Sequence, residues 1–365
     1  MVYLDNAATV PLLPSVREVM HRTEERFFAN ASALHTPGHL AMNEIEQCRT
    51  VLAELIGAKP DEIIFTSGAT ESNNTVIHTF EGCLIECSPL EHHSILEAAR
   101  VYRGKDYPKL YSYMLYNNET GEKVLDTQSE LFLDICSEKK SDHNKVYLHS
   151  DLTQALGKVP IDVNELGLDY ATLSAHKIGG PIGVGALYVR HGALFKPLLI
   201  GGNQEHKRRG GTYNTVGIAG FRAALEYACD NKTWEIYDTS VRELRDLLAR
   251  RILAEIPGSS LNTDISHDAS LPNILNVSFE AAEGESIQLY LDAEGVVVST
   301  GSACATGDIK PSHVLMAKTG DAEIAHSSIR FSFGLDNTAS DVEQVMDVLP
   351  GIIERLQNIS TVKRK

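Results

Sequence analysis

The chain has 365 residues, of which 43% are hydrophobic, and its 49 acidic side chains outnumber its 33 basic ones to give a formal net charge of −16. A chain of this length can bury a large core and is expected to form two domains. Strong acidity without a basic face argues against a protein that binds nucleic acid or a membrane surface. No apolar run approaches the length that spans a bilayer, so we expect no membrane segment.

The cysteines follow no disulfide framework and no zinc-ligand spacing, so we expect free, buried thiols and no metal site. They are Cys48, Cys83, Cys87, Cys136, Cys229 and Cys304. Free thiols are typical of a reducing compartment. The sequence enters structured residues at once, from Val2 to Asp5, which leaves no signal or transit peptide. We therefore expect a cytoplasmic protein.

The first third of the chain alternates predicted helices with predicted strands, as in an α/β protein. In chain order we expect strand 2–4, a helix opened by Pro14, polar loop 30–38, helix 39–56, strand 62–66, a helix, strand 84–87, a further helix and strand 111–116. Gly57 follows the second helix and is placed to end it in the left-handed conformation.

Two stretches of this part could contact a ligand. Strand 62–66 runs through the glycine-containing turn 67–73 into a helix, and the free N–H groups of a helix N-terminus bind anions. Many α/β turns share this pattern without holding phosphate, so the signal is weak alone. His92 and His93 precede the next helix. One of them could lie flat on an aromatic cofactor, or both could simply cap the helix.

Lys177 and Asp151 carry the clearest chemical signal. Strand 145–149 leads to Asp151, and Lys177 lies in a glycine-rich turn between strands 170–173 and 184–189. Ligands of α/β proteins gather at such strand ends. A lysine that forms a Schiff base and a carboxylate that keeps a pyridine nitrogen protonated fit pyridoxal 5′-phosphate (PLP). Each residue alone is more often structural. Together with the anion-binding turn 67–73 and the loop around Cys304, described below, the pair favours PLP.

The rest of the chain is expected to contain a long helical segment and a second set of strands. The basic cluster 207–212 could contact phosphate, although such runs are more often solvated. In chain order follow helix 216–256, strand 274–279, helix 286–291, strand 296–299 and strand 329–333. The pattern Ser340-x-x-Glu343 predicts a capping box for the last helix, which Pro350 is expected to kink or split.

Cys304 lies in a stretch of small residues, 299–308. With nothing to bury, this stretch is expected to form an exposed, mobile loop. A free thiol in such a loop can attack as a thiolate and move between sites. An incidental surface cysteine is the alternative, but the surrounding glycines and hydroxyls favour a functional loop.

Together these stretches resemble the cysteine desulfurases of the NifS/IscS type, which are PLP-dependent enzymes of the class V aminotransferase group. The resemblance covers nearly the whole chain and is most specific at 66–73, 174–177 and 301–304. It implies an α/β protein of the PLP-dependent transferase fold type I, with a mostly parallel central sheet in a large domain and a small α+β domain. The large PLP-binding domain would span 14–230. Residues 1–13 and 231–365 would form the small domain that carries the cysteine loop.

The resemblance also implies a role for each matching residue. Lys177 would carry PLP and move the Cα proton, His92 would stack on the ring and take part in catalysis, and Cys304 would attack the sulfur of bound cysteine. The cofactor-binding residues would be Lys177, Asp151, Gln154, His92, Ala69, Thr70, Asn118, Ser174, His176 and, from the partner subunit of a homodimer, Thr212. The substrate-binding residues would be Arg330, Asn118 and Asn30.

The implied reaction converts L-cysteine to L-alanine and leaves a persulfide on Cys304 for a sulfur acceptor protein, either an iron–sulfur scaffold or a tRNA-thiolation protein. A selenocysteine lyase, a class V aminotransferase and a non-catalytic protein that kept the fold stay open as alternatives. The chain departs from its relatives between the His92 helix and Asn118, where it is expected to be shorter by about one supersecondary unit at the edge of the sheet.

Overall fold

The computed structural model describes residues 1–141, 145–300 and 311–360. The chain divides into two compact units. Unit 1 contains Met1–Thr9, Tyr116–Lys123 and Glu235–Lys365, and unit 2 contains Val10–Leu115 and Val124–Trp234. The short segment 116–123 thus groups with unit 1. The functional domains expected from the sequence, 14–230 and 1–13 with 231–365, stay a prediction.

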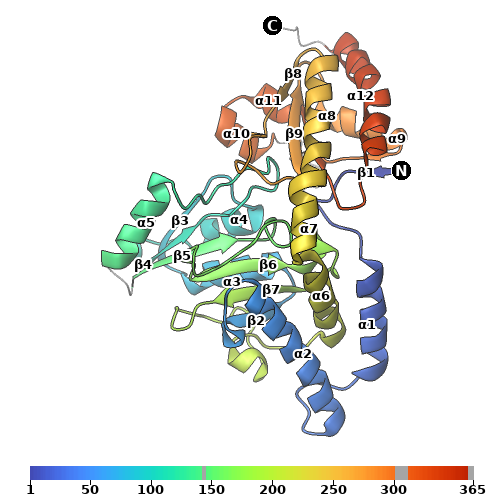
Figure 1. Ribbon diagram of the computed structural model, residues 1–365. Helices are drawn as coiled ribbons and strands as arrows, with labels where there is room; N and C mark the ends of the chain where they lie inside the picture. Colours follow the sequence, from blue (N-terminus) through green and yellow to red (C-terminus); the bar gives the residue numbers. More distant parts are fainter. Residues whose placement is uncertain (142–144, 301–310, 361–365) are drawn as a thin grey trace. The chain divides into compact units, whose positions relative to one another are not determined.

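Unit 2 is built on a six-stranded sheet. Its strands are β2 (Ile63–Thr66), β3 (Cys83–Cys87), β4 (Asp106–Ser112), β5 (Val146–Asp151), β6 (Tyr170–Ser174) and β7 (Gly185–Val189). Their order is β2-β7-β6-β5-β4-β3, with β3 at an edge (Figure 1). β3 to β6 pair in parallel, whereas β7 is antiparallel to both β2 and β6. The sheet is mostly parallel, so the predicted α/β fold class is confirmed.

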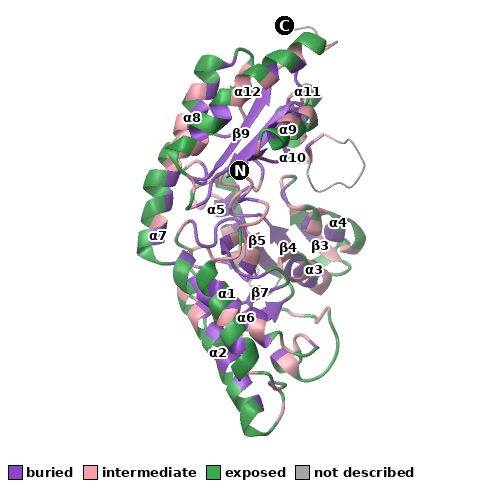
Figure 2. Ribbon diagram, turned by 90° about the vertical axis from the view of Figure 1, so that its right-hand side faces the viewer, coloured by how far each residue is buried: buried purple, intermediate pink, exposed green. Residues whose placement is uncertain are grey.

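Helices surround this sheet because its central strands are buried on both faces. Every residue of β5, β6 and β7 is buried. Figure 2 shows the buried colour over the region of the sheet labelled β5 and β7. The helices are α1 (Pro14–Arg26), α2 (Thr36–Leu55), α3 (Ala69–Thr79), α4 (His93–Tyr102), α5 (Glu130–Ser141) and α6 (Thr215–Ala228). The Phe80 ring lies 5.4 Å from that of Tyr147 and 5.9 Å from that of Tyr170, between ring centroids. Such aromatic contacts add to the burial energy of the core.

Helix ends in unit 2 follow the local sequence. Pro14 occupies the first turn of α1, where its missing N–H is not needed. α2 begins three residues earlier than we predicted, because the His35 side chain caps it by accepting the N–H of Gly38 (3.2 Å). Gly57 follows α2 with φ +73°, as predicted, and a Cβ atom there would lie 2.8 Å from the Asp162 carboxylate. Only glycine fits that position.

Unit 1 contains a three-stranded antiparallel sheet in the order β11 (Ser328–Ser332), β9 (Ile274–Phe279) and β8 (Ser259–Leu261). β1 (Val2–Tyr3) pairs in parallel with β10 (Val296–Val297). The helices are α7 (Asn231–Ile236), the π-helical turn η4 (Tyr237–Val241), α8 (Arg242–Glu255), α9 (Gly284–Ala293), α10 (His313–Thr319), α11 (Ala322–His326) and α12 (Ala339–Ile359). Alternate residues of β9 and β11 join residues of α8, α9 and α12 in one apolar core.

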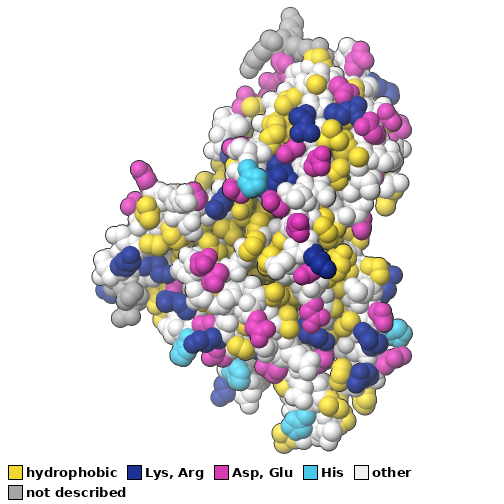
Figure 3. All heavy atoms as spheres, viewed as in Figure 1, with side chains coloured by type: hydrophobic (Ala, Val, Ile, Leu, Met, Phe, Trp, Pro, Cys, Tyr) yellow, Lys and Arg dark blue, Asp and Glu magenta, His cyan; other side chains and the backbone are white. Residues whose placement is uncertain are grey.

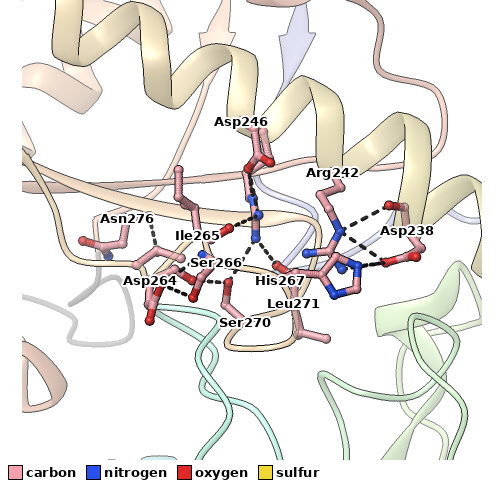
Figure 4. A network of polar contacts seen from close by, with 12 residues as sticks. Asp238, Arg242, Asp246, Asp264, Ile265, Ser266, His267, Ser270, Leu271 and Asn276 are labelled. Atoms are coloured by element: carbon pink, nitrogen blue, oxygen red, sulfur yellow. Dashed lines mark hydrogen bonds and ion pairs between the residues drawn. The ribbon is translucent and has the colours of Figure 1, made fainter.

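A buried arginine connects α8 to the loop before β9. Arg245 is 0% exposed. Its guanidinium donates to the Asp246 carboxylate (2.8 Å), to Oγ of Ser270 (3.0 Å) and to the carbonyl oxygen of Leu271 (2.8 Å) (Figure 4). A buried charge is tolerated only when it is paired and hydrogen-bonded in this way. The network therefore fixes the loop 262–273 against α8.

Several sequence expectations need correction. α12 opens with a capping box at Thr338 and Asp341, because the Asp341 carboxylate accepts the N–H of Thr338 (2.8 Å), so the predicted box at Ser340 and Glu343 is wrong. α12 continues unsplit through Pro350. The fourth strand spans 106–112 rather than 111–116, because pairing with β5 ends at Ser112. The helical stretch 216–256 is interrupted at 229–230.

The surface carries both signs of charge. Figure 3 shows acidic and basic side chains interspersed on the face that it displays. The thiols of Cys48 and Cys229 are buried as expected, but Cys83, Cys87 and Cys136 are half-buried, and all five are free. Across residues 1–141, 145–300 and 311–360, no cluster of three metal-ligating side chains occurs. In those same ranges no helix has the length and apolarity to cross a bilayer.

Candidate active site

Five strands of unit 2 end at one edge of the sheet. β3, β4, β5 and β6 are parallel, and β2 runs in their direction because β7 is antiparallel to both β2 and β6. Ligands of α/β proteins bind at the carboxyl ends of strands. Most of the predicted cofactor-binding residues lie at this edge, either at the end of a strand or just after it. They follow β2, β3, β5 and β6 in the chain and are Ala69, Thr70, His92, Asp151, Gln154, Ser174, His176 and Lys177.

Lys177 lies in a 3₁₀ turn, η2 (Ala175–Ile178), that joins β6 to β7. Gly179 ends this turn at φ +76°, and a Cβ atom there would lie 2.6 Å from Cγ of Leu13. The N–H of Leu13 donates to the carbonyl oxygen of Gly179 (3.0 Å). The turn therefore requires glycine at 179 and fixes the backbone from which the half-buried Lys177 side chain extends.

A second lysine lies next to Lys177. Lys158 is 3% exposed, and its Nζ lies 3.4 Å from the carbonyl oxygen of Lys177. Burial, together with the charge of Lys177, lowers the pKa of Lys158 to about 7. The neutral amine of Lys158 therefore lies beside the turn that carries Lys177.

Asp151 is the last residue of β5 and is 7% exposed. Its Oδ1 accepts the backbone N–H of Thr153 (2.9 Å), and its Oδ2 accepts from Nδ2 of Asn73 (2.8 Å). Hydrogen bonds of this kind stabilise the charged carboxylate. His149, two residues earlier on β5, has its pKa lowered to about 4 by burial. Asp151 thus has a hydrogen-bond donor on each oxygen and lies on the same strand as a neutral imidazole.

His92 is the N-cap residue of α4. Its Nδ1 accepts the backbone N–H of Ser94 (3.1 Å). Burial lowers the pKa of His92, the positive charge of Lys177 lowers it further, and the negative charge of Asp151 opposes both. The cap uses Nδ1, so the ring face and Nε2 take no part in it. The two interpretations left open by the sequence, a helix cap and a cofactor contact, are therefore compatible.

The N-terminus of α3 suits an anion. Its N-cap residue is Gly68, which has φ +144° and no side chain to occupy the first-turn N–H groups of Ala69 and Thr70. A Cβ atom on Gly185 would lie 2.7 Å from Cα of Gly68, so the start of β7 passes close to this turn. Free N–H groups and the positive end of the helix dipole both favour a phosphate here.

The remaining predicted cofactor residues differ in exposure. Ser174 ends β6 and is buried, as is Gln154 in the turn after Asp151. His176 is half-buried in η2, and burial with the charges of Lys177 and Lys158 lowers its pKa to about 4. A neutral imidazole can donate a hydrogen bond to phosphate without adding charge.

The loop predicted to bring Thr212 to a phosphate is fixed by a buried ion pair. Arg49 donates from both terminal nitrogens to the two carboxylate oxygens of Glu205, at 2.8 Å each. Glu205, His206 and Lys207 all have φ between 47° and 67°, a left-handed conformation that costs energy in residues other than glycine. The ion pair therefore holds a strained turn, and Thr212 is exposed beyond it.

Replacing Arg49 with alanine is expected to lower the free energy of unfolding by about 3 to 5 kcal/mol, because the Glu205 carboxylate would stay buried without its partner. Arg49 is only 3% exposed. Urea unfolding of the variant measures the loss. The control is Arg100→Ala, whose ion pair with Glu97 is exposed and should contribute less than about 1 kcal/mol. Equal losses in the two variants would contradict this role of the ion pair.

Arg330 and Asn118, the predicted carboxylate-binding residues, are brought together in unit 1. Arg330 lies on β11 opposite Asn276 of β9. It donates from one terminal nitrogen to the carbonyl oxygen of Asn118 (2.8 Å) and from the other to Oδ1 of Asp5 (2.7 Å). Its buried Nε has no hydrogen-bond partner among the described residues. The guanidinium is thus held in place and keeps a donor for a carboxylate.

Glu119, which we did not single out from the sequence, lies beside this pair. It is 3% exposed, and its carboxyl group accepts a hydrogen bond from Oγ of Ser312, the N-cap residue of α10. Burial raises the pKa of Glu119 to about 7, although the Ser312 hydrogen bond and the Arg330 charge oppose the change. The carboxyl group is therefore protonated below about pH 7 and is a buried anion above it.

The Glu119→Gln variant is expected to remove a pH dependence of stability. On folding, the pKa of this carboxyl group rises from 4.5 to about 7. Its proton therefore stabilises the fold fully at a pH below 4.5, the pKa in the unfolded chain. This contribution is lost as the pH rises through about 7, the pKa in the folded protein. The contribution is about 3 kcal/mol at most. The gain in unfolding free energy of the variant over the wild type should therefore grow from acidic to alkaline pH. A constant difference would contradict the protonated state.

Two predicted residues are not explained by this geometry. Asn30 is exposed in the loop between α1 and α2, where its Oδ1 accepts the backbone N–H of Ser32 (2.9 Å). The described contacts give it a local role in that loop. Cys304 lies outside the described residues, and its predicted role stays a prediction.

The residues at the sheet edge fit PLP. Asp151 is a buried carboxylate held by two donors, which suits a protonated ring nitrogen. Lys177 extends from a fixed turn, and the glycine-opened end of α3 suits the phosphate group. PLP needs a carboxylate for its ring nitrogen, a lysine for its aldehyde and a helix N-terminus for its phosphate, and one edge of the sheet offers all three.

The comparisons with known proteins agree with this chemistry. The family model described as aminotransferase class-V matches residues 2–106 and 103–345, and the chain belongs to that family. Its two matched segments meet at residues 103–106, in the connection from α4 to β4; the shorter segment expected between the His92 helix and Asn118 stays a prediction. The protein from Dictyoglomus turgidum named cysteine desulfurase IscS is 40% identical over 395 aligned positions, which cover 100% of this chain and 97% of the relative. Within its family the chain is therefore one of the cysteine desulfurases, which are PLP-dependent enzymes.

Solved structures show the same fold. A protein described as NifS-like superposes with a TM-score of 0.84 at 32% identity, covering 98% of this chain and 100% of its own. The structure described as SspA in complex with cysteine has a TM-score of 0.74 at 30% identity, covering 91% of this chain and 99% of its own. The predicted fold type I architecture is confirmed by these neighbours.

Proposed function

We propose that the chain converts L-cysteine to L-alanine and holds the released sulfur as a persulfide on Cys304. One observation carries the proposal: a single sheet edge gathers a buried carboxylate, a lysine on a fixed turn and a glycine-opened helix N-terminus. The relatives named cysteine desulfurase and the neighbour solved with cysteine support the choice of substrate.

The residues of unit 2 would hold and activate the cofactor. Bound PLP supplies a ring that withdraws electrons and stabilises negative charge at the substrate Cα. Asp151 would keep the ring nitrogen protonated, and Lys177 would attach the cofactor and carry the Cα proton. The remaining ligands that we propose are Ala69, Thr70, Gln154, Ser174 and His176 on one protomer, with Thr212 of the partner subunit.

The residues of unit 1 would bind the substrate and take its sulfur. Arg330 and Asn118 hold the substrate carboxylate, and Asn30 of unit 2 assists. The Cys304 thiolate attacks the substrate sulfur, so that an S–S bond forms while the substrate Cβ–S bond breaks. A proton then completes L-alanine at Cβ. The free Nε of the buried Arg330 supports its part in this scheme.

Three further features belong to the proposal. The exposed position of Thr212 supports a homodimer in which it contacts the other protomer's cofactor. The free thiols support a reducing compartment, the cytoplasm. The sulfur acceptor would be a protein of iron–sulfur cluster assembly, as the IscS name of the relatives suggests, or one of tRNA thiolation.

Trapping the persulfide tests the proposal. The purified protein is mixed with L-cysteine, alkylated and digested, and the mass of the peptide that contains Cys304 is measured by mass spectrometry. One additional sulfur atom on Cys304, present only with L-cysteine and absent from the Lys177→Ala variant, is the expected result. Sulfur on another cysteine, or none, would contradict the assignment of Cys304.

A further inference from the structure

A chain of hydrogen bonds leads from Asp151 to His92. Nδ2 of Asn73 donates both to Oδ2 of Asp151 (2.8 Å) and to Oγ of Ser94 (2.9 Å). Oγ of Ser94 in turn lies 2.8 Å from Nδ1 of His92. Asn73 is fully buried on α3, Ser94 is in the first turn of α4, and Asp151 ends β5. Three separate elements thus join the predicted ring-nitrogen ligand to the predicted stacking residue.

The direction of each hydrogen bond follows from the donors. Asp151 as a carboxylate can only accept, so the NH₂ end of Asn73 must face it. Because that same group donates to Ser94, the hydroxyl hydrogen of Ser94 is left to point at Nδ1 of His92. The backbone N–H of Ser94 donates to the same nitrogen (3.1 Å). Two donors on Nδ1 leave it without a proton, so the neutral ring carries its proton on Nε2.

Capping of α4 alone does not require this chain. The backbone bond from Ser94 to Nδ1 already completes the cap. Asn73 adopts its orientation although its Oδ1 is buried without a hydrogen-bond partner among the described residues, an arrangement that costs stability. This orientation of the Asn73 amide is explained if its function is to hold Asp151 and, through Ser94, His92, rather than to cap the helix.

We infer that Asn73 and Ser94 are positioning residues that hold His92 as a neutral imidazole with its only proton on Nε2. His92 then contacts its ligand as a hydrogen-bond donor, and proton abstraction falls to Lys177. A neutral histidine that donates from one nitrogen is an established way to polarise a substrate without adding charge. The catalytic meaning of the inference rests on the proposed function, whereas the state of the ring does not.

The charged groups around His92 are compatible with this state. Asp151 on β5 favours the charged ring, whereas burial, Lys177 in η2 and His93 on α4 disfavour it. Burial has the largest effect, and the net result is a lower pKa for His92. The two donors on Nδ1 act in the same direction, because they stabilise the neutral ring.

The test is nitrogen NMR of the cofactor-loaded protein with ¹⁵N-labelled histidine, in which the His92→Gln variant identifies the His92 signals. The expected spectrum has a protonated Nε2 and a bare, hydrogen-bonded Nδ1. In Ser94→Ala one donor is lost, so the pKa of His92 should rise by about 0.5 to 1. Ser94→Thr keeps the hydroxyl and should restore the wild-type value. Asn74→Ala is the matched control, since among the described residues the Asn74 side chain donates to the carbonyl oxygens of Ser94 and Thr70 and to neither His92 nor Asp151.

The outcomes separate this inference from the proposed function. A proton on Nδ1 in the wild type, or an unchanged His92 pKa in Ser94→Ala, would overturn the inference whatever the activity. The expected spectrum in a protein that releases no alanine from L-cysteine would uphold the state of His92 and refute the desulfurase assignment. The same rise of the pKa in Asn74→Ala would show a general effect of the α3–α4 contact and would also overturn the inference.

Discussion

Replacing Lys177 with alanine should lower alanine release from L-cysteine by about 10³-fold or more. Lys177 is proposed to attach the cofactor and to move the Cα proton, and loss of a positioned acid or base alone lowers rates by about 10²- to 10⁴-fold. The fold should survive, because the contact and the hydrogen bond between Gly179 and Leu13 fix the turn.

Two measurements separate a chemical effect from a structural one. Visible absorbance of the purified variant reports whether the cofactor is still attached, and thermal unfolding reports the fold. Lys196→Ala is the control, since Lys196 is a half-exposed lysine of the same unit that pairs with Glu81 and should be dispensable. Full activity in Lys177→Ala would show that another amine, such as neighbouring Lys158, attaches the cofactor.

Replacing Asp151 with asparagine should lower kcat by about 10²- to 10³-fold, the loss expected when a fixed charge that stabilises the transition state is removed. Asparagine has the same shape, so it can still accept the N–H of Thr153 or Nδ2 of Asn73. What it cannot do is hold a proton on a ring nitrogen by its charge. The account therefore predicts a large effect on rate and a small one on stability.

The comparison with Asp151→Glu sharpens this prediction. Glutamate keeps the charge but adds a methylene in a site that is only 7% exposed, so it should regain part of the rate and lose some stability. If Asp151→Asn keeps the wild-type rate, the charge of Asp151 is not needed and PLP chemistry at this edge is contradicted. Steady-state kinetics and thermal unfolding of the three proteins decide the matter.

Local patterns were enough to predict most of the framework around the site. Apolar runs placed the strands that end at Asp151 and before Lys177 within one or two residues, because buried parallel strands are continuous apolar runs. Gly57 and the start of α1 at Pro14 were predicted from local chemistry alone. The capping box of α12 was wrong because Thr338 and Asp341 offer the same pattern two residues earlier.

The residues that sequence reasoning missed act over long separations. Asn73 ends the predicted turn 67–73, yet its hydrogen bond to Asp151 joins residues that are 78 positions apart. Glu119 follows the predicted Asn118, but its hydrogen-bond donor Ser312 comes 193 positions later. Arg49 and Glu205 form their ion pair across 156 positions. No periodicity or local motif reports such pairings, because tertiary packing creates them.

The most direct test of the central claim is the release of alanine and sulfide from L-cysteine in the presence of a reductant. The wild type should form the two products in equal amounts, while Cys304→Ala and Lys177→Ala form neither at an appreciable rate. This result would establish desulfuration through both residues. A wild type that binds PLP but releases neither product, or a Cys304→Ala variant with full turnover, would contradict the account.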